Sequence, residues 1–147
     1  MAQFKVIVTD NISPEGLDIL KRDGTIDVDL RPGIKHDELK KIIGTYDAVI
    51  TRSGTAVTAD LIENPGKLKI VGRAGVGLDN VDSEAASKKG IIVMNAPTGN
   101  TFAANELTLG IMLAAARKIP LANASLKSGQ WDRKNSWAFN SITKPWE

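Results

Sequence analysis

The stretch KVIVTDNISPEGLDILKRDGTIDVDL, residues 5–30, contains a complete strand–helix–strand pattern. Its first run, Lys5–Thr9, is short, continuous and rich in β-branched residues, as is typical of a strand buried on both faces of a parallel sheet. Ser13 then provides an N-cap directly before Pro14, a combination that favours the start of a helix. The run Ile26–Leu30 alternates apolar and polar residues, which indicates an edge strand. The stretch therefore predicts the first βαβ unit of an α/β fold.

The same alternation of strands and helices continues to about residue 95. Three further apolar runs read as strands: Ala48–Thr51, Leu68–Val71 and Ile91–Met94. The helical segments between them are Asp37–Ile43, Ala59–Ile62 with Thr58 as its cap, and a segment that begins after Asp82 and ends at Gly90. This order predicts a doubly wound parallel sheet of the flavodoxin-like type. Right-handed crossovers then bring the loops after the strands to one edge, where such sheets bind ligands.

The last third of the sequence has a different character. Thr101–Lys118 is one long helical run rich in alanine and leucine, Pro120 interrupts it, and Leu121–Lys127 is helical again. Residues after 134 show no clear periodicity. We therefore expect a domain over residues 1–100, linking helices over 101–134 and an atypical tail over 135–147.

Composition narrows the function classes. The 147 residues contain no cysteine, which excludes disulfides and thiolate metal sites and favours a reducing compartment, the cytoplasm. The net charge of +2 is small, and the basic residues are scattered among acids, which argues against a nucleic-acid partner. No stretch is long and apolar enough for a membrane span, and we expect no membrane partner. The single histidine, His36, precedes a helical segment and is expected to be solvated rather than to bind a metal.

Two arginines follow neighbouring strands of the predicted sheet. Arg52 and Ser53 come directly after the third strand, and Arg73 follows the fourth. A guanidinium group presents a planar fork of donors that suits carboxylate or phosphate oxygens, so two of them favour a small, doubly anionic substrate. The alternative is a pair of surface arginines that form ion pairs with nearby acids.

A glycine-rich loop follows the fourth strand but lacks the pattern of a dinucleotide fingerprint. From Gly75 it reads G-x-G-x-x-N, and the next helix begins only after Asp82. Its glycines either let the backbone approach a ligand closely or form an ordinary flexible loop. After the fifth strand, Asn100 or Thr101 can cap the long helix, and the open amides of its first turn favour an anionic or polar ligand.

These loops together carry a family resemblance. The segments are Thr51–Ser53, Val71–Asp82, Val93–Pro97, Gly99–Thr101 and Glu106-Leu107. From Phe4 to about Lys134 the chain resembles the NAD-dependent D-2-hydroxyacid dehydrogenases, which pass a hydride from a 2-hydroxy acid to NAD and form a 2-keto acid.

The resemblance assigns roles to particular residues. It implies that the substrate, a phosphoglycerate-like acid of the kind used in serine biosynthesis, is bound by four residues: Arg52, Ser53, Arg73 and Gly75. It implies that Val76 and Asn100 lie toward the cofactor. It also implies a homodimer, because in the family the long helix packs against the cofactor domain and a second subunit.

The sequence departs from the family after Lys134. There the family has a glycine-rich fingerprint, whereas Asn135–Glu147 contains none, and the family's catalytic arginine, glutamate and histidine have no counterpart in these residues. We therefore expect no Rossmann domain, no catalytic residue, no NAD binding and no activity in this chain alone. One alternative is a non-catalytic anion-binding or dimerisation module. A phosphoacceptor domain is the other, with Asp10 at its first acidic position, but Thr51-Arg52 would not hold the metal.

Overall fold

The computed structural model describes residues 3–22 and 24–131. The chain divides into two compact units, Met1–Gly99 and Asn100–Glu147. The predicted tail, residues 135–147, lies outside the described residues.

The first unit is built on a five-stranded sheet with the order β2-β1-β3-β4-β5. All four strand pairings are parallel. The strands are β1 (Phe4–Val8), β2 (Ile26–Leu30), β3 (Ala48–Thr51), β4 (Ile70–Arg73) and β5 (Ile92–Asn95). The parallel sheet and the edge position of β2 are as the sequence predicts.

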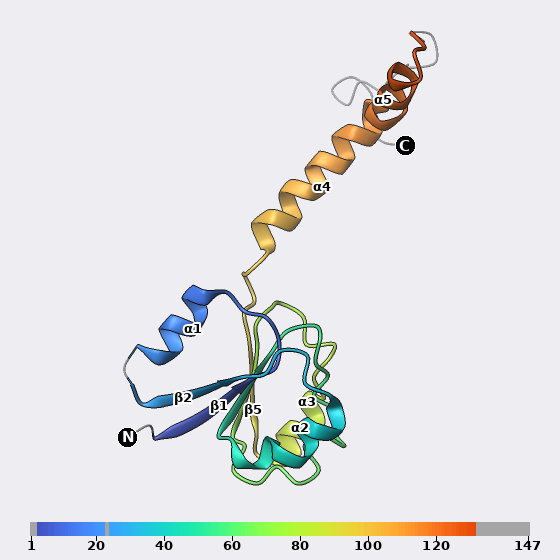
Figure 1. Ribbon diagram of the computed structural model, residues 1–147. Coiled ribbons are helices and arrows are strands. Elements are labelled where there is room, and N and C mark those ends of the chain that lie inside the picture. Colours follow the sequence, from blue (N-terminus) through green and yellow to red (C-terminus); the bar gives the residue numbers. More distant parts are fainter. Residues whose placement is uncertain (1–2, 23, 132–147) are drawn as a thin grey trace. The chain divides into compact units, whose positions relative to one another are not determined.

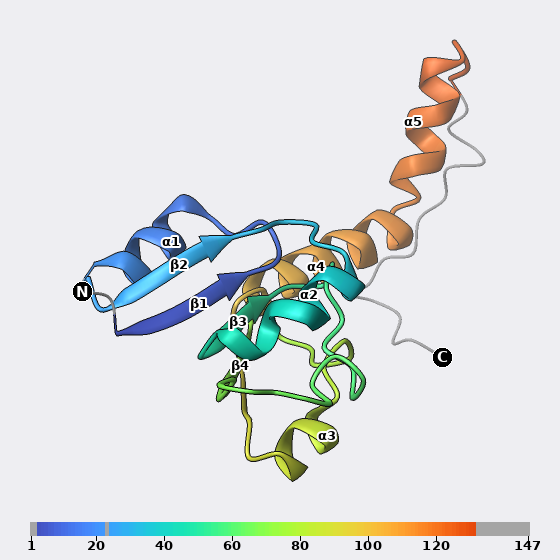
Figure 2. The same ribbon diagram turned by 60° about the horizontal axis from the view of Figure 1, so that its bottom comes forward.

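Helices cover the two faces of this sheet unequally. They are α1 (Pro14–Lys21), α2 (His36–Ile42), the 3-10 helix η1 (Ile43–Thr45) and α3 (Ser83–Lys88). Figures 1 and 2 show α1 on one side of the sheet and α2 and α3 on the other. The predicted caps are present: Ser13 Oγ accepts a hydrogen bond from Gly16 N at 3.3 Å, and Asp82 Oδ1 accepts one from Ala85 N at 2.9 Å.

The hydrophobic core lies between the sheet and the helices α2 and α3. Ile7, Val49 and Val71 point to this face from the three central strands, and all are fully buried. Leu39 of α2 and Ala86 of α3 pack against them. Aliphatic side chains of this kind supply most of the burial free energy of the unit.

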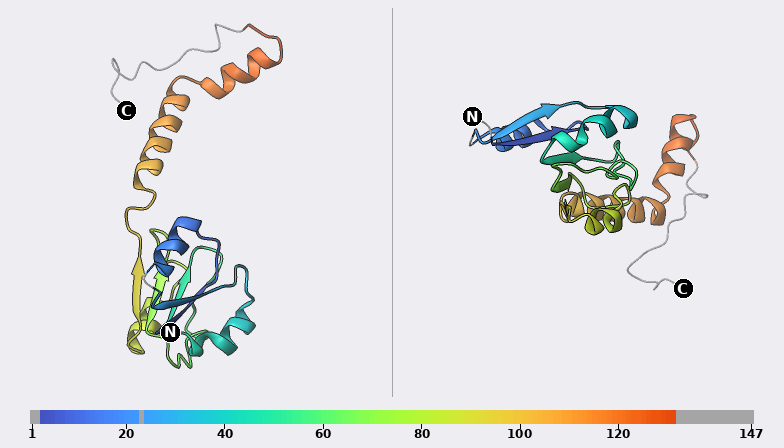
Figure 3. Two further views of the ribbon diagram at one scale, coloured as in Figure 1. Left: turned by 60° about the vertical axis from the view of Figure 1, so that its left-hand side comes forward. Right: turned by 90° about the horizontal axis from the view of Figure 1, so that it is seen from below.

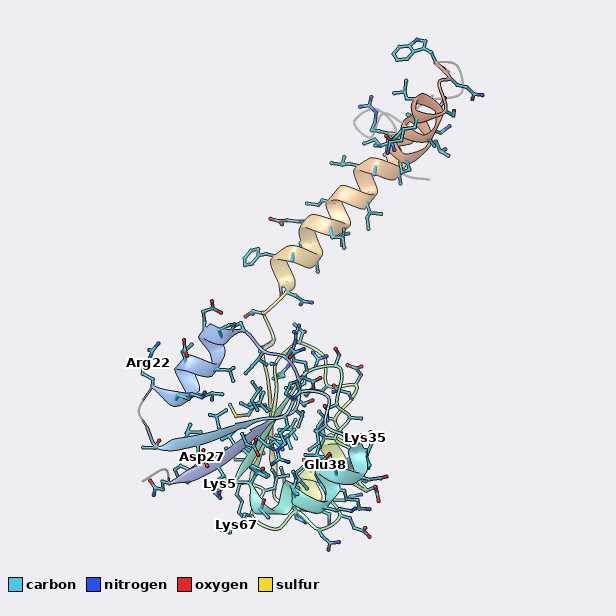
Figure 4. All side chains as sticks on the ribbon, in the orientation of Figure 1. Lys5, Arg22, Asp27, Lys35, Glu38 and Lys67 are labelled. Atoms are coloured by element: carbon cyan, nitrogen blue, oxygen red, sulfur yellow. The ribbon has the colours of Figure 1, made fainter. Side chains whose placement is uncertain are left out.

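The opposite face of the sheet is more open. Phe4, Ile70 and Met94 remain exposed there, beside an apolar groove of about 610 Å³ that also touches Leu20 of α1. Exposed charges of both signs surround the first unit, as the side chains labelled in Figure 4 illustrate: Lys5, Arg22, Asp27, Lys35, Glu38 and Lys67.

Two local predictions are wrong. The expected helix at Ala59–Ile62 is a turn, although Thr58 Oγ1 still accepts a hydrogen bond from Leu61 N at 3.3 Å. Pro65 follows too closely, because a residue before proline avoids the α-helical region and the segment has no room for a second turn. The fourth strand begins at Ile70 rather than Leu68, which enters the core from the preceding turn.

The second unit contains two helices, α4 (Thr101–Ala116) and α5 (Ile119–Lys127), which Figure 3 shows as separate rods joined by a short turn. The break falls at Lys118, whose φ of 48° is left-handed, and Pro120 occupies the first turn of α5, where a proline is tolerated. Glu106 is the only charged residue of α4. None of the helices in the described part of the chain is long and apolar enough to cross a membrane.

Candidate anion site at the carboxyl edge of the sheet

The register of the sheet brings the two predicted arginines to the same edge. Thr51 at the end of β3 is paired with Arg73 at the end of β4, so Arg52 begins its loop one residue beyond this pair. Neighbouring strands lie about 4.8 Å apart, which leaves room for one small ligand to meet both side chains. Arg52 and Ser53 are exposed, and Arg73 is half-buried.

The Arg73 guanidinium has unused donors. Its Nε is buried and has no hydrogen-bond partner among the described residues. Over residues 3–22 and 24–131, neither Arg73 nor Arg52 forms an ion pair with an acidic side chain. The alternative of two arginines engaged by surface acids therefore has no support in this part of the chain.

Gly75 leaves the space in which the Arg73 guanidinium lies. A Cβ added at Gly75 would collide with Arg73 Nη1 and would lie 2.8 Å from Arg73 Cζ. The absence of a side chain at Gly75 is therefore what allows the arginine to lie across the loop. This is a more specific reason for the glycine than general flexibility.

Three hydrogen bonds hold the glycine-rich loop against its neighbours. Ala74 N donates to Thr51 O at 2.8 Å, and Ala96 N donates to Gly75 O at 3.0 Å. Asn95 Nδ2 donates to Val76 O at 2.7 Å. The loops after β3, β4 and β5 are thus tied together, with Gly75 and Val76 between them. Sequence reasoning gave Asn95 no role, although its position at the end of a strand was a usable signal.

Arg52 is held through its backbone as well as its side chain. Arg52 N donates to Asp10 Oδ2 at 2.8 Å, and Arg52 Nη1 donates to Asn11 O at 3.2 Å. On the other side, Asn80 Nδ2 donates to Arg52 O at 2.5 Å. Sequence reasoning missed both Asp10 and Asn80 as partners of this loop, because the three segments are far apart along the chain.

The ionised form of Asp10 is the stable one at this edge. Burial raises the pKa of the carboxyl, but hydrogen bonds from Arg52, Thr51 and Thr55 outweigh it and hold the pKa below its usual value. A carboxyl with a depressed folded-state pKa contributes stability that is present above its unfolded pKa and is lost as the pH falls through the folded value. The Asp10 carboxylate therefore accepts hydrogen bonds from the loop in its ionised form.

Asn100 and His36 both lie at the starts of helices. Asn100 belongs to the second unit, at the N-cap position of α4, and its side chain makes no capping hydrogen bond. His36 is the first residue of α2 rather than the residue before it, and its Nε2 lies 3.0 Å from Asp60 Oδ2. The part of the chain that the structure describes contains no group of three or more histidine, cysteine or acidic residues suited to a metal ion.

The close contact between Gly75 and the Arg73 guanidinium leads to a first prediction. We expect Gly75→Ala to displace the Arg73 guanidinium and to weaken phosphate binding about fivefold to tenfold, because a charge-assisted hydrogen bond is lost. The melting temperature should change little, since the colliding group is the end of a flexible side chain. Phosphate titration followed by NMR, with thermal unfolding of the same samples, measures both. Gly110→Ala is the control, because a Cβ there meets no described atom within 4 Å outside its own helix backbone. If Gly75→Ala binds phosphate as tightly as the unmodified chain, Gly75 is not needed to position the Arg73 guanidinium.

Comparison with known proteins agrees with this architecture. The model of the family "D-isomer specific 2-hydroxyacid dehydrogenase, catalytic domain" matches residues 6–144. The chain is 52% identical over 130 residues to D-3-phosphoglycerate dehydrogenase of Methanocaldococcus jannaschii, covering 88% of this chain and 24% of that protein. It is 46% identical over 131 residues to the enzyme of the same name from Archaeoglobus fulgidus, covering 89% and 25%.

Solved structures give the same result. A protein from Pyrococcus horikoshii OT3 has a TM-score of 0.78 at 32% identity and covers 89% of this chain and 39% of its own. The NAD+-bound 3-phosphoglycerate dehydrogenase of Entamoeba histolytica has a TM-score of 0.67 at 30% identity, with 80% and 40% covered. The chain spans about a quarter of the length of the curated relatives it matches. From the family match over nearly its whole length, the chain belongs to the D-isomer specific 2-hydroxyacid dehydrogenases.

Proposed function

We propose that this chain is the substrate-binding part of an NAD-dependent 3-phosphoglycerate dehydrogenase. In this proposal Arg52, Ser53 and Arg73 hold the carboxylate and phosphate of the substrate, and the backbone at Gly75 approaches it. The observation that carries the proposal is the half-buried Arg73, whose Nε has no hydrogen-bond partner in the described residues and which lies one register position from the start of the Arg52 loop. The two relatives from archaea bear the name of this activity.

The charge of the site suits a doubly anionic substrate. Neither guanidinium group forms an ion pair with an acidic side chain in the described residues, so both are available to an anion at the carboxyl edge of the sheet. Each can hold one oxygen pair in a fixed geometry, so a ligand with an anion at each end is oriented as well as bound. Orientation of the carbon between those anions is what this chain contributes to hydride transfer.

The N-terminus of α3 does not suit the pyrophosphate of a dinucleotide. The glycine-rich loop returns through the Val57–Val81 bridge before α3 begins, and the Asp82 carboxylate occupies the N-terminus of that helix. An anion at this position would meet a like charge instead of free amides. When bound, NAD accepts the hydride in this family. We propose that Val76 and Asn100 each contribute to cofactor contact, and that this chain alone binds substrate without turnover.

A second candidate function is self-association, in cytoplasmic homodimers, through α4. Within the second unit this helix exposes large apolar side chains: Phe102, Leu107, Leu109, Ile111, Met112 and Leu113. Apolar patches of this extent are typical of interfaces. This function is compatible with anion binding and does not need catalysis.

The substrate proposal predicts a specific pattern of binding. 3-Phosphoglycerate should shift the NMR amide signals of Ser53 and Gly75, and should bind more tightly than inorganic phosphate or D-glycerate, because each of these offers only one anion. Arg73→Ala should weaken binding about tenfold or more. Arg22→Ala is the matched control, since Arg22 is an exposed arginine at the end of α1. NAD reduction should stay at background. Shifts confined to other regions, or equal losses in the two variants, would contradict the proposed site.

A further inference from the structure

The loop of residues 52–55 carries Arg52 and Ser53 of the anion site. It has the sequence Arg-Ser-Gly-Thr, and residues 53–55 are bends. Within the described residues, none of its backbone amides donates to a backbone carbonyl. Its conformation therefore depends on hydrogen bonds in which side chains take part, from Thr51 at the end of β3 and from two other loops.

One such contact comes from the loop after β1. Asp10 Oδ2 accepts hydrogen bonds from Arg52 N and from Thr51 Oγ1, both at 2.8 Å. Thr51 is fully buried, so this end of the contact is anchored in the core. Gly54 closes over the same carboxylate, because a Cβ there would collide with Asp10 Oδ1.

The other contact comes from the loop after β4. Asn80 Nδ2 donates to Arg52 O at 2.5 Å and to Thr55 O at 2.6 Å, which uses both of its hydrogens. The backbone of Asn80 is itself fixed, since its carbonyl accepts from Val57 N at 2.8 Å. The Asn80 side chain therefore bridges the carbonyl groups at both ends of the loop, while its own backbone is held by Val57.

Asp10 and Asn80 act on the two backbone polar groups of the same residue. The N–H of Arg52 is held by Asp10, and the C=O of Arg52 is held by Asn80. We propose that Asp10 and Asn80 are positioning residues that clamp the Arg52 backbone from both sides and hold its guanidinium ready for the anion. This proposal rests on the proposed function for its ligand. The clamp lowers the cost of ordering the loop when the ligand binds.

The sharpest test compares removal of the acceptor with removal of the charge alone. Asp10→Ala removes the acceptor. Asp10→Asn keeps an acceptor oxygen for Arg52 N, so it should restore most of the binding that Asp10→Ala loses. Asp47→Ala is the matched control, because Asp47 Oδ2 accepts from Lys5 N at the same 2.8 Å, but at the opposite edge of the sheet. Asn80→Ala tests the other side of the clamp.

Two readouts are measured on the full chain: the Arg52 amide proton shift and exchange rate without ligand, and the dissociation constant for 3-phosphoglycerate. We expect Asp10→Ala and Asn80→Ala to speed Arg52 amide exchange about tenfold and to weaken binding about fivefold to tenfold. Asp47→Ala should lower stability without either change.

If 3-phosphoglycerate does not bind the unmodified chain, the proposed function fails, while the ligand-free Arg52 amide still tests the clamp. If that amide is unchanged in Asp10→Ala and Asn80→Ala, the clamp itself is wrong.

Discussion

Gly66→Ala is expected to lower the free energy of unfolding by about 3–5 kcal/mol, which is a large fraction of the total stability of a typical domain. Gly66 has a φ of +56°, and a Cβ there would lie 2.8 Å from Gly44 Cα and collide with the Gly44 carbonyl oxygen. Both colliding groups are backbone, so neither can rotate away. The turn also delivers the chain to β4, because Lys67 N donates to Gly44 O at 2.9 Å.

Gly33→Ala separates the collision from the backbone strain. Gly33 has a comparable φ of +75°, but a Cβ there would have no neighbour within 4 Å in the part of the chain that the structure describes. We expect this variant to lose only about 1–2 kcal/mol, the cost of a left-handed conformation for a residue with a side chain. Urea denaturation of both variants measures the difference. Equal losses would show that strain at positive φ, rather than the contact between Gly66 and Gly44, determines the effect.

The double substitution Leu107→Gln and Ile111→Gln is expected to convert an associating chain into a monomer. The two side chains are 64% and 59% exposed and lie one helical turn apart on the same side of α4. Burial of two such residues in an interface contributes roughly 1.5–3 kcal/mol each, so their loss should weaken association at least about a hundredfold.

Sedimentation equilibrium over a wide concentration range measures this association. Ile19→Gln in α1 is the matched control, because Ile19 is 61% exposed but lies in the first unit. The control should associate as the unmodified chain does. A monomeric unmodified chain would contradict the self-association proposal, and association that persists in the double variant would exclude the Leu107 side of α4 as the contact.

The strands and the helix caps depend on local sequence. Strand identity and the caps at Ser13 and Asp82 depend on neighbouring residues, and the structure confirms them. The helix predicted at Ala59–Ile62 is wrong, because Pro65 overrides the helical composition of the segment and leaves room for only one turn. Sequence patterns thus predicted the element order well and the element ends less well.

For the candidate site, the sequence by itself determined that Arg52 and Arg73 follow adjacent parallel strands, because strand order and right-handed crossovers bring strand ends to one edge. Only the tertiary structure decided what holds them there. The hydrogen bond that Arg52 N donates to Asp10 spans 42 positions of the chain, and the one that Arg52 O accepts from Asn80 spans 28. The contact of Gly66 with Gly44 likewise joins two separate turns. No local periodicity or capping pattern encodes such pairs, because they depend on how the loops after different strands pack once the sheet has formed.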